Sequence, residues 1–137
     1  MRLTSRIVCG LAAACGLALV LLSSTTPVLA HHGFAAEFDR SNVVTLKGQV
    51  TKMEFENPHV YIYVDVKGDD GKVVNWAFEG TTPNALIRQG WHKDTVKAGD
   101  TVTIKGYRAR DGSNLAYFAS INFNDGRPSP TDKLPPP

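Results

Sequence analysis

The sequence predicts a small all-β domain: an antiparallel barrel of five strands, with one short helix between the third and fourth strands. Three observations predict it. Apolar and polar side chains alternate along several stretches, which is the period of a half-buried strand. Clusters of glycine, asparagine and aspartate separate those stretches, as turns do. A stretch with the residues that begin a helix follows the third predicted strand.

The hairpin expected over residues 57–79 is the clearest element. Valine and isoleucine alternate with tyrosine and charged residues along 60–67, and a turn rich in glycine and aspartate follows. The alternation then resumes as far as residue 79. Bulky side chains on one face of a strand suit a core, so we expect Trp76 and Phe78 to be buried.

The strand expected over residues 44–55 precedes the hairpin and is irregular. Its apolar side chains occupy even positions in the first half and odd positions in the second. A bulge near Thr51 and Lys52 would reconcile the two halves. Gly48 indicates a sharp bend or a close approach of another backbone.

The helix and the last two strands complete the domain. Thr82 is a helix-capping residue, Pro83 suits the first helical position, and a glycine closes the short helix expected over 85–89. Strands are expected over 101–106 and 115–123, and one face of the last strand should hold Leu115, Tyr117, Ala119, Ile121 and Phe123. This order of elements is that of the OB-fold, a partly open Greek-key barrel. A plain antiparallel sandwich is the alternative.

Residues 1–30 have the order of a secretory signal peptide. Basic residues come first, an apolar run covers 7–22, and a small residue, Ala30, ends the segment. A membrane anchor is the competing interpretation, but the apolar run is short and no basic stop follows it. Cleavage after Ala30 predicts a periplasmic or secreted protein that leaves the membrane, with an OB-like domain over 31–124 and a proline-rich flexible tail over 125–137.

Charge and cysteine content limit the function further. The chain has 15 Lys and Arg against 13 Asp and Glu, and two of the basic residues lie in the predicted signal. The remainder is formally neutral and has no basic stripe, which argues against nucleic acid as a partner. Cys9 and Cys15 both lie in the predicted signal, so the exported protein would have neither a disulfide nor a cysteine metal site.

Several motifs taken together resemble a known family. They are His31-His32-Gly33-Phe34, Asn57-Pro58-His59, and the segments 75–80, 83–86 and 106–113. The chain resembles a family of small exported bacterial proteins that is known only as a domain of unknown function, of the 6152 type. The likeness covers nearly all of the chain after residue 30 and implies an exported, OB-like β-barrel. It implies no activity, and no functional residue can be carried over from it.

A histidine at the predicted cleavage point indicates a metal site. After cleavage His31 would carry a free α-amine, which can chelate a metal together with its own ring nitrogen. His32 and His59 could supply further imidazoles, and a set of nitrogen ligands favours copper(II). The alternative is that the two N-terminal histidines form a mobile polar end, and that a backbone carbonyl satisfies His59. His92, beside Trp91 in a predicted loop, is expected to be solvent-exposed.

Aromatic side chains on the hairpin indicate a second kind of site. Tyr61 and Tyr63 fall on the face opposite the valine and isoleucine row, so they should point outward if that row is core. OB barrels bind extended ligands across strands two and three, where aromatic rings stack on the ligand. The two tyrosines are therefore a candidate face for a small extended ligand or a protein partner, with no metal required.

The sequence contains no recognisable catalytic motif. It lacks the nucleophile-elbow, zinc-protease, phosphate-loop and EF-hand patterns, and the spacing of its carboxylates does not indicate an acid–base pair. We therefore expect a binding protein that is not an enzyme. A copper oxidoreductase is a third interpretation. The small size of the domain counts against it, and so does the lack of a sequence pattern that would place an acidic residue behind the histidines.

Overall fold

The computed structural model describes residues 33–130. The predicted signal peptide, His31 and His32 lie outside the described residues, as does the end of the chain after residue 130. Among the residues that are described, no helix is long and apolar enough to cross a membrane.

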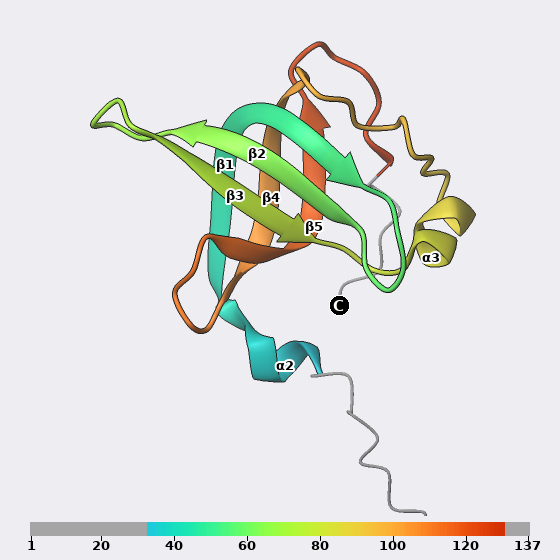
Figure 1. The fold of residues 1–137 in the computed structure, drawn as a ribbon, viewed down its shortest axis with the longest axis horizontal. Helices are drawn as coiled ribbons and strands as arrows, with labels where there is room; N and C mark the ends of the chain where they lie inside the picture. The colour runs from blue at the N-terminus through green and yellow to red at the C-terminus, as the bar shows by residue number, and fades with distance from the viewer. Residues whose placement is uncertain (1–32, 131–137) are drawn as a thin grey trace, which may run out of the picture. The chain divides into compact units, whose positions relative to one another are not determined.

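Residues 33–130 form a mostly β structure with five strands and two short helices (Figure 1). The order is α2 (Phe34–Glu37), β1 (Phe38–Glu54), β2 (Tyr61–Lys67), β3 (Val73–Glu79), α3 (Pro83–Arg88), β4 (Thr101–Ala109) and β5 (Leu115–Phe123). Helix α2 was not predicted, because four residues are too few to show a helical period. Strand β1 begins earlier than predicted and β4 ends later.

The strands form one mixed sheet in the order β1-β2-β3-β5-β4, and β4 pairs back to β1, so the ring of pairings is closed. Four of the pairings are antiparallel, but β3 and β5 run parallel. The expectation that every pairing would be antiparallel is therefore wrong. The cause is the long connection from β3 through α3 and β4, which returns the chain in the same direction.

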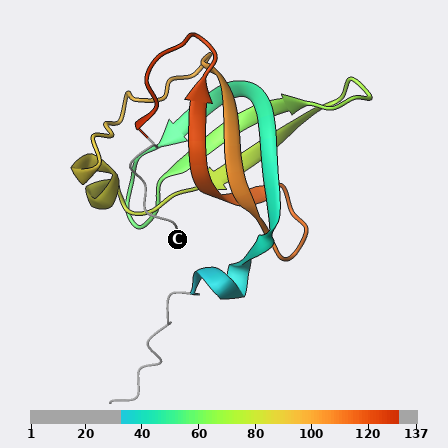
Figure 2. The same cartoon turned by 180° about the vertical axis from the view of Figure 1, so that it is seen from behind.

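Strand β1 is long and strongly curved, and it contributes to two pairings (Figures 1 and 2). The predicted bulge is present, because the register with β2 shifts between Val50 and Lys52. The predicted close approach at Gly48 is present as well. A Cβ atom built on Gly48 would lie 2.3 Å from the carbonyl oxygen of Asp65, so no larger residue fits without movement of the backbone.

The core lies inside the closed sheet, and the hairpin β2–β3 supplies much of it. Trp76 is 9% exposed and Phe78 is fully buried, as predicted. Thr82 caps helix α3, and its hydroxyl accepts a hydrogen bond from the Ala85 amide at 3.3 Å. Beyond the helix, Trp91 is fully buried and packs edge-on against a core phenylalanine. Other buried side chains of the cluster are Val50, Val60, Ile62, Val64, Leu86, Val102, Ile104, Phe118 and Ile121.

The prediction that five side chains share one face of β5 is wrong, because the first half of the strand presents the opposite face. Ala116 and Phe118 are buried there, whereas Leu115 and Tyr117 are only partly buried. The register with β4 skips Ala119, which makes that residue an extra one in the strand and reverses the faces. After Ala119 the predicted positions are the buried ones. A uniform alternation of apolar and polar residues could not reveal the reversed faces, because the bulge arises from the pairing of β5 with β4.

Helix α2 covers part of the outer surface of the sheet. The ring of Phe34 lies 5.8 Å from that of Tyr107 and 5.1 Å from that of Tyr117, in both cases edge-on. Arg40 places its guanidinium 4.9 Å from the Phe34 ring, and Arg110 donates a hydrogen bond to the carbonyl of α2 residue Ala35. The helix is therefore fixed to β4 and β5 by aromatic and polar contacts.

The first part of the predicted tail, residues 125–130, is held to the domain by Arg127. Its guanidinium forms ion pairs at 2.8 Å with Asp100 and with Asp125. It also lies 4.0 Å from the centre of the Phe123 ring.

Candidate functional site

One row of side chains crosses the whole sheet on its outer surface. The strand registers pair neighbours directly across the strands, in the order Glu54, Tyr61, Glu79, Tyr117 and Tyr107. Directly paired residues project from the same face of a sheet. Because the neighbours of these residues along the chain include core side chains, this row lies on the outer face.

A carboxylate, an imidazole and a phenol meet in the middle of this row. We call Glu79, His59 and Tyr61 the Glu79 cluster. Glu79 is 6% exposed, its Oε1 contacts Nδ1 of His59, and its Oε2 accepts a hydrogen bond from the Tyr61 hydroxyl at 2.9 Å. The His59 side chain is 33% exposed. Nδ1 thus contacts a carboxylate and makes no hydrogen bond to a backbone carbonyl, which the alternative interpretation had required. Nε2 is the ring nitrogen that Glu79 does not contact.

Burial, together with nearby negative charge, raises the pKa values of two tyrosines in this region. Burial raises the pKa of Tyr61 well above its ordinary value, and the hydrogen bond to Glu79 and the charges of Glu79 and Glu37 raise it further. Burial also raises the pKa of Tyr117, with a smaller contribution from the charge of Glu79. The phenols are therefore held in their neutral, hydrogen-bond-donating form.

Replacing Glu79 with glutamine should lower the pKa of Tyr61, because the neighbouring negative charge that opposes ionisation is removed. NMR titration of isotope-labelled tyrosine rings measures this directly. Glu54→Gln is the matched control, since Glu54 bonds Tyr63 at 2.9 Å and should alter mainly that residue. An unchanged Tyr61 titration in Glu79→Gln would contradict the cluster.

The same shift predicts a loss of stability at high pH. The pKa of Tyr61 is higher in the folded protein than in the unfolded chain. Its contribution to stability is therefore complete below about pH 10, the ordinary tyrosine value, and decreases as the pH rises above it. Tyr61→Phe should remove this part of the decrease in urea-unfolding measurements made between neutral and alkaline pH.

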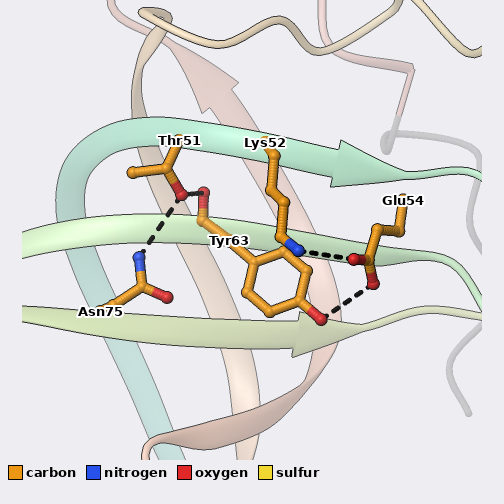
Figure 3. Close-up of polar contacts among 5 residues, drawn as sticks. All are labelled: Thr51, Lys52, Glu54, Tyr63 and Asn75. Carbon is orange, nitrogen blue, oxygen red and sulfur yellow. Dashed lines mark hydrogen bonds and ion pairs between the residues drawn. The ribbon is translucent and has the colours of Figure 1, made fainter.

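Tyr63 lies beside the cluster in a network of polar contacts (Figure 3). Its hydroxyl donates to Glu54 at 2.9 Å, and Lys52 joins the same carboxylate at 2.6 Å. The ammonium of Lys52 also lies 4.3 Å from the centre of the Tyr63 ring. Thr51 bonds the Tyr63 carbonyl at 3.3 Å and accepts from the Asn75 amide at 3.4 Å. The network joins β1, β2 and β3.

The two tyrosines predicted as a ligand face are neighbours on the outer surface. The rings of Tyr61 and Tyr63 lie 6.3 Å apart with 30° between their planes. Both residues are partly buried, whereas Val60, Ile62 and Val64 are core. We call Tyr61, Tyr63 and their outward neighbours Lys52, Glu54, Asp65 and Asn75 the tyrosine face.

The predicted metal ligands are only partly within the described residues. His59 belongs to the Glu79 cluster, and His31 and His32 lie outside. His92 is exposed in the loop after α3, where its amide donates to the Thr95 hydroxyl at 2.7 Å. Across residues 33–130, no group of three or more histidine, cysteine, aspartate or glutamate side chains could hold a metal.

Glu79 is the site residue that the spacing along the sequence did not single out, because that spacing favoured a solvated charge, whereas Glu79 is 6% exposed. A signal for it exists, because a hairpin that turns at residues 68–72 places residue 79 opposite residue 61. The register of the hairpin would therefore have brought a carboxylate beside Tyr61 and close to His59.

The fold and the site define a small mixed-sheet β domain with a buried carboxylate between a histidine and a tyrosine. The family model DUF6152, described as a family of unknown function, matches residues 18–117 of the 137-residue chain. The chain belongs to this family. No curated protein and no solved structure matches it.

Proposed function

We propose that the chain is a small exported binding protein of the periplasm or cell exterior, without enzymatic activity of its own, that binds copper(II). The chelate is the α-amine and ring of His31, with His32 and His59 as further imidazole ligands. The observation that supports this is the contact of His59 Nδ1 with the buried Glu79. Metal-binding histidines commonly donate their other ring nitrogen to a carboxylate, which fixes the tautomer and leaves Nε2 for the metal.

The ligand chemistry selects the metal. Imidazole and amine nitrogens suit copper(II), which also leads the affinity series of the divalent first-row metals. Both kinds of nitrogen bind only when deprotonated, so affinity should fall as the pH drops. Glu79 also supplies an acidic residue behind His59, which the sequence alone did not indicate. A copper oxidoreductase is still the third interpretation.

We also propose that the sheet is an OB-like barrel. The strand order β1-β2-β3-β5-β4, the return pairing of β4 with β1, and the position of α3 between β3 and β4 support this. In that fold the outer face of strands two and three is the usual binding surface, and the Glu79 cluster lies at its end.

Copper titration of correctly processed protein tests the proposal. Protein that begins at a free His31 should bind copper(II) more tightly than the same protein acetylated on the α-amine of His31, because acylation removes the lone pair of that amine from coordination. His31→Ala and His59→Ala should also weaken binding, whereas His92→Ala, the matched control, should not. Glu79→Gln should weaken binding by about 10–100-fold, the usual effect of losing a carboxylate behind a histidine ligand.

Intact mass of the exported protein, measured with and without chelator, gives the N-terminus and any bound metal before the titration begins. Equal affinities of the free and the N-acetylated proteins would end the chelate proposal. An N-terminus other than His31 would do the same.

A second candidate function is a metal-free, OB-like module that binds an extended ligand or a protein partner through Tyr61 and Tyr63. The observation that favours it is that both hydroxyls are bonded to carboxylates, so the two rings are held in place on the outer face. Binding that survives exhaustive removal of metal, and that is lost in Tyr63→Ala, would support this function.

A further inference from the structure

We propose that the tyrosine face binds an uncharged, hydroxyl-rich glycan chain that lies along β2. This inference rests on the second candidate function and names its ligand class. It requires no copper, because it uses only side chains of β1, β2 and β3 that are described by the structure (Figure 3).

The two aromatic rings are preorganised for such a ligand. Tyr61 and Tyr63 lie two residues apart on β2 and share one face of it. Their rings are 6.3 Å apart, and the ring planes differ by 30°. Bonds from their hydroxyls to Glu79 and Glu54, each 2.9 Å long, restrain both rings in the free protein. Less side-chain freedom is then lost on binding, which is the general advantage of a rigid aromatic surface.

The polar groups around the two rings suit a ligand that carries hydroxyl groups and not a ligand that carries charges. Asn75 donates to Asp65 at 2.7 Å, which places a planar amide and a planar carboxylate beside the tyrosines. Such groups accept hydrogen bonds from sugar hydroxyls. The lysine beside the rings, Lys52, already pairs with Glu54 at 2.6 Å. With carboxylates at Glu54, Asp65 and Glu79, this face offers little attraction to a phosphate or nucleic-acid chain.

Lys52 competes with the proposed ligand for the face of the Tyr63 ring. Its ammonium lies 4.3 Å from the ring centre, so a sugar that stacks there has to displace it. The Lys52 side chain is 56% exposed and has a long flexible stem, so it can move into solvent. Removing this competitor should strengthen glycan binding, an effect opposite in sign to that of removing the ring.

The experiment follows backbone amide resonances by NMR in chelator-treated protein that begins at His31. The probes are cellohexaose and chitohexaose at millimolar concentration, with an extended hexapeptide of serine and valine as the comparison. One of the two glycans should shift resonances of β2 and β3. Tyr63→Ala should weaken that binding about tenfold. Tyr63→Phe should weaken it less, because the ring remains and only its bond to Glu54 is lost, and Lys52→Ala should strengthen it. Ile87→Ala, on the exposed side of α3, is the control without effect.

Each other outcome overturns the inference and also distinguishes it from the candidate functions. If neither glycan shifts β2 and β3, the glycan assignment is wrong. If the peptide alone shifts them and Tyr63→Ala abolishes the effect, the second candidate function stands and its ligand is a peptide. If Tyr63→Ala and the control lose glycan binding equally, the site lies elsewhere. None of these results bears on copper, because the chelator is present throughout.

Discussion

Phe78→Ala is expected to destabilise the protein by about 3–5 kcal/mol, the usual effect of emptying a buried aromatic position. Phe78 is fully buried, and its Cδ1 lies 3.2 Å from where a Cβ on Gly106 would stand. The ring thus packs directly on the backbone of β4, across the closed sheet. Strand β4 pairs with β1 on one edge and with β5 on the other, so its backbone is fixed on both sides. The cavity left by the substitution therefore cannot close by a small movement of β4. Urea unfolding measures the loss.

Tyr63→Ala is the comparison, because Tyr63 belongs to the same hairpin but projects from the outer face. We expect a loss of about 1 kcal/mol there, from a partly exposed ring and one hydrogen bond. Equal losses in the two variants would show that the faces of the hairpin had been assigned wrongly.

Gly48→Ala is expected to destabilise the protein by about 1–3 kcal/mol, although it adds one methyl group. That methyl would lie 2.3 Å from the Asp65 carbonyl oxygen and 2.6 Å from Cγ1 of Val64. The first contact is with backbone that β1 and β2 hold in register, so relief requires the two strands to separate. Thermal or urea unfolding measures the loss.

Gly80→Ala is the matched control for this glycine. The nearest atom to a Cβ there is the Val60 carbonyl oxygen at 3.6 Å, which is an ordinary contact. The control should change stability by less than about 1 kcal/mol. If Gly48→Ala is tolerated as well as Gly80→Ala, the close crossing of β1 and β2 is not a constraint on the fold.

The features that the sequence could predict are those that local pattern decides. The hairpin, the burial of Trp76 and Phe78, the bulge near Thr51 and the close approach at Gly48 all leave a mark within a few residues. The parallel pairing of β3 with β5 and the reversed face at Ala119 leave no such mark. Both depend on which strand becomes the neighbour, and that is decided by the whole chain.

The candidate site divides in the same way. The sequence could point to His59, Tyr61 and Tyr63, because their residue types and alternation are visible along the chain. It did not point to Glu79, whose role comes from its place across the strand from Tyr61. It also gave no account of Phe34, which contacts aromatic rings that come more than seventy residues later in the sequence.

The pairing of β1 with β4, which closes the sheet, can form only late in the synthesis of the chain. Strand β1 finds one partner in the next strand of the chain, but its other partner, β4, begins only at Thr101. A chain emerging from the ribosome therefore holds β1 with one open edge until most of it has been made. Contacts so distant in sequence also form slowly. A nascent chain of this kind stays unfolded for longer than a helical one would, and an unfolded chain is the form that the export proposed above would need to thread across a membrane.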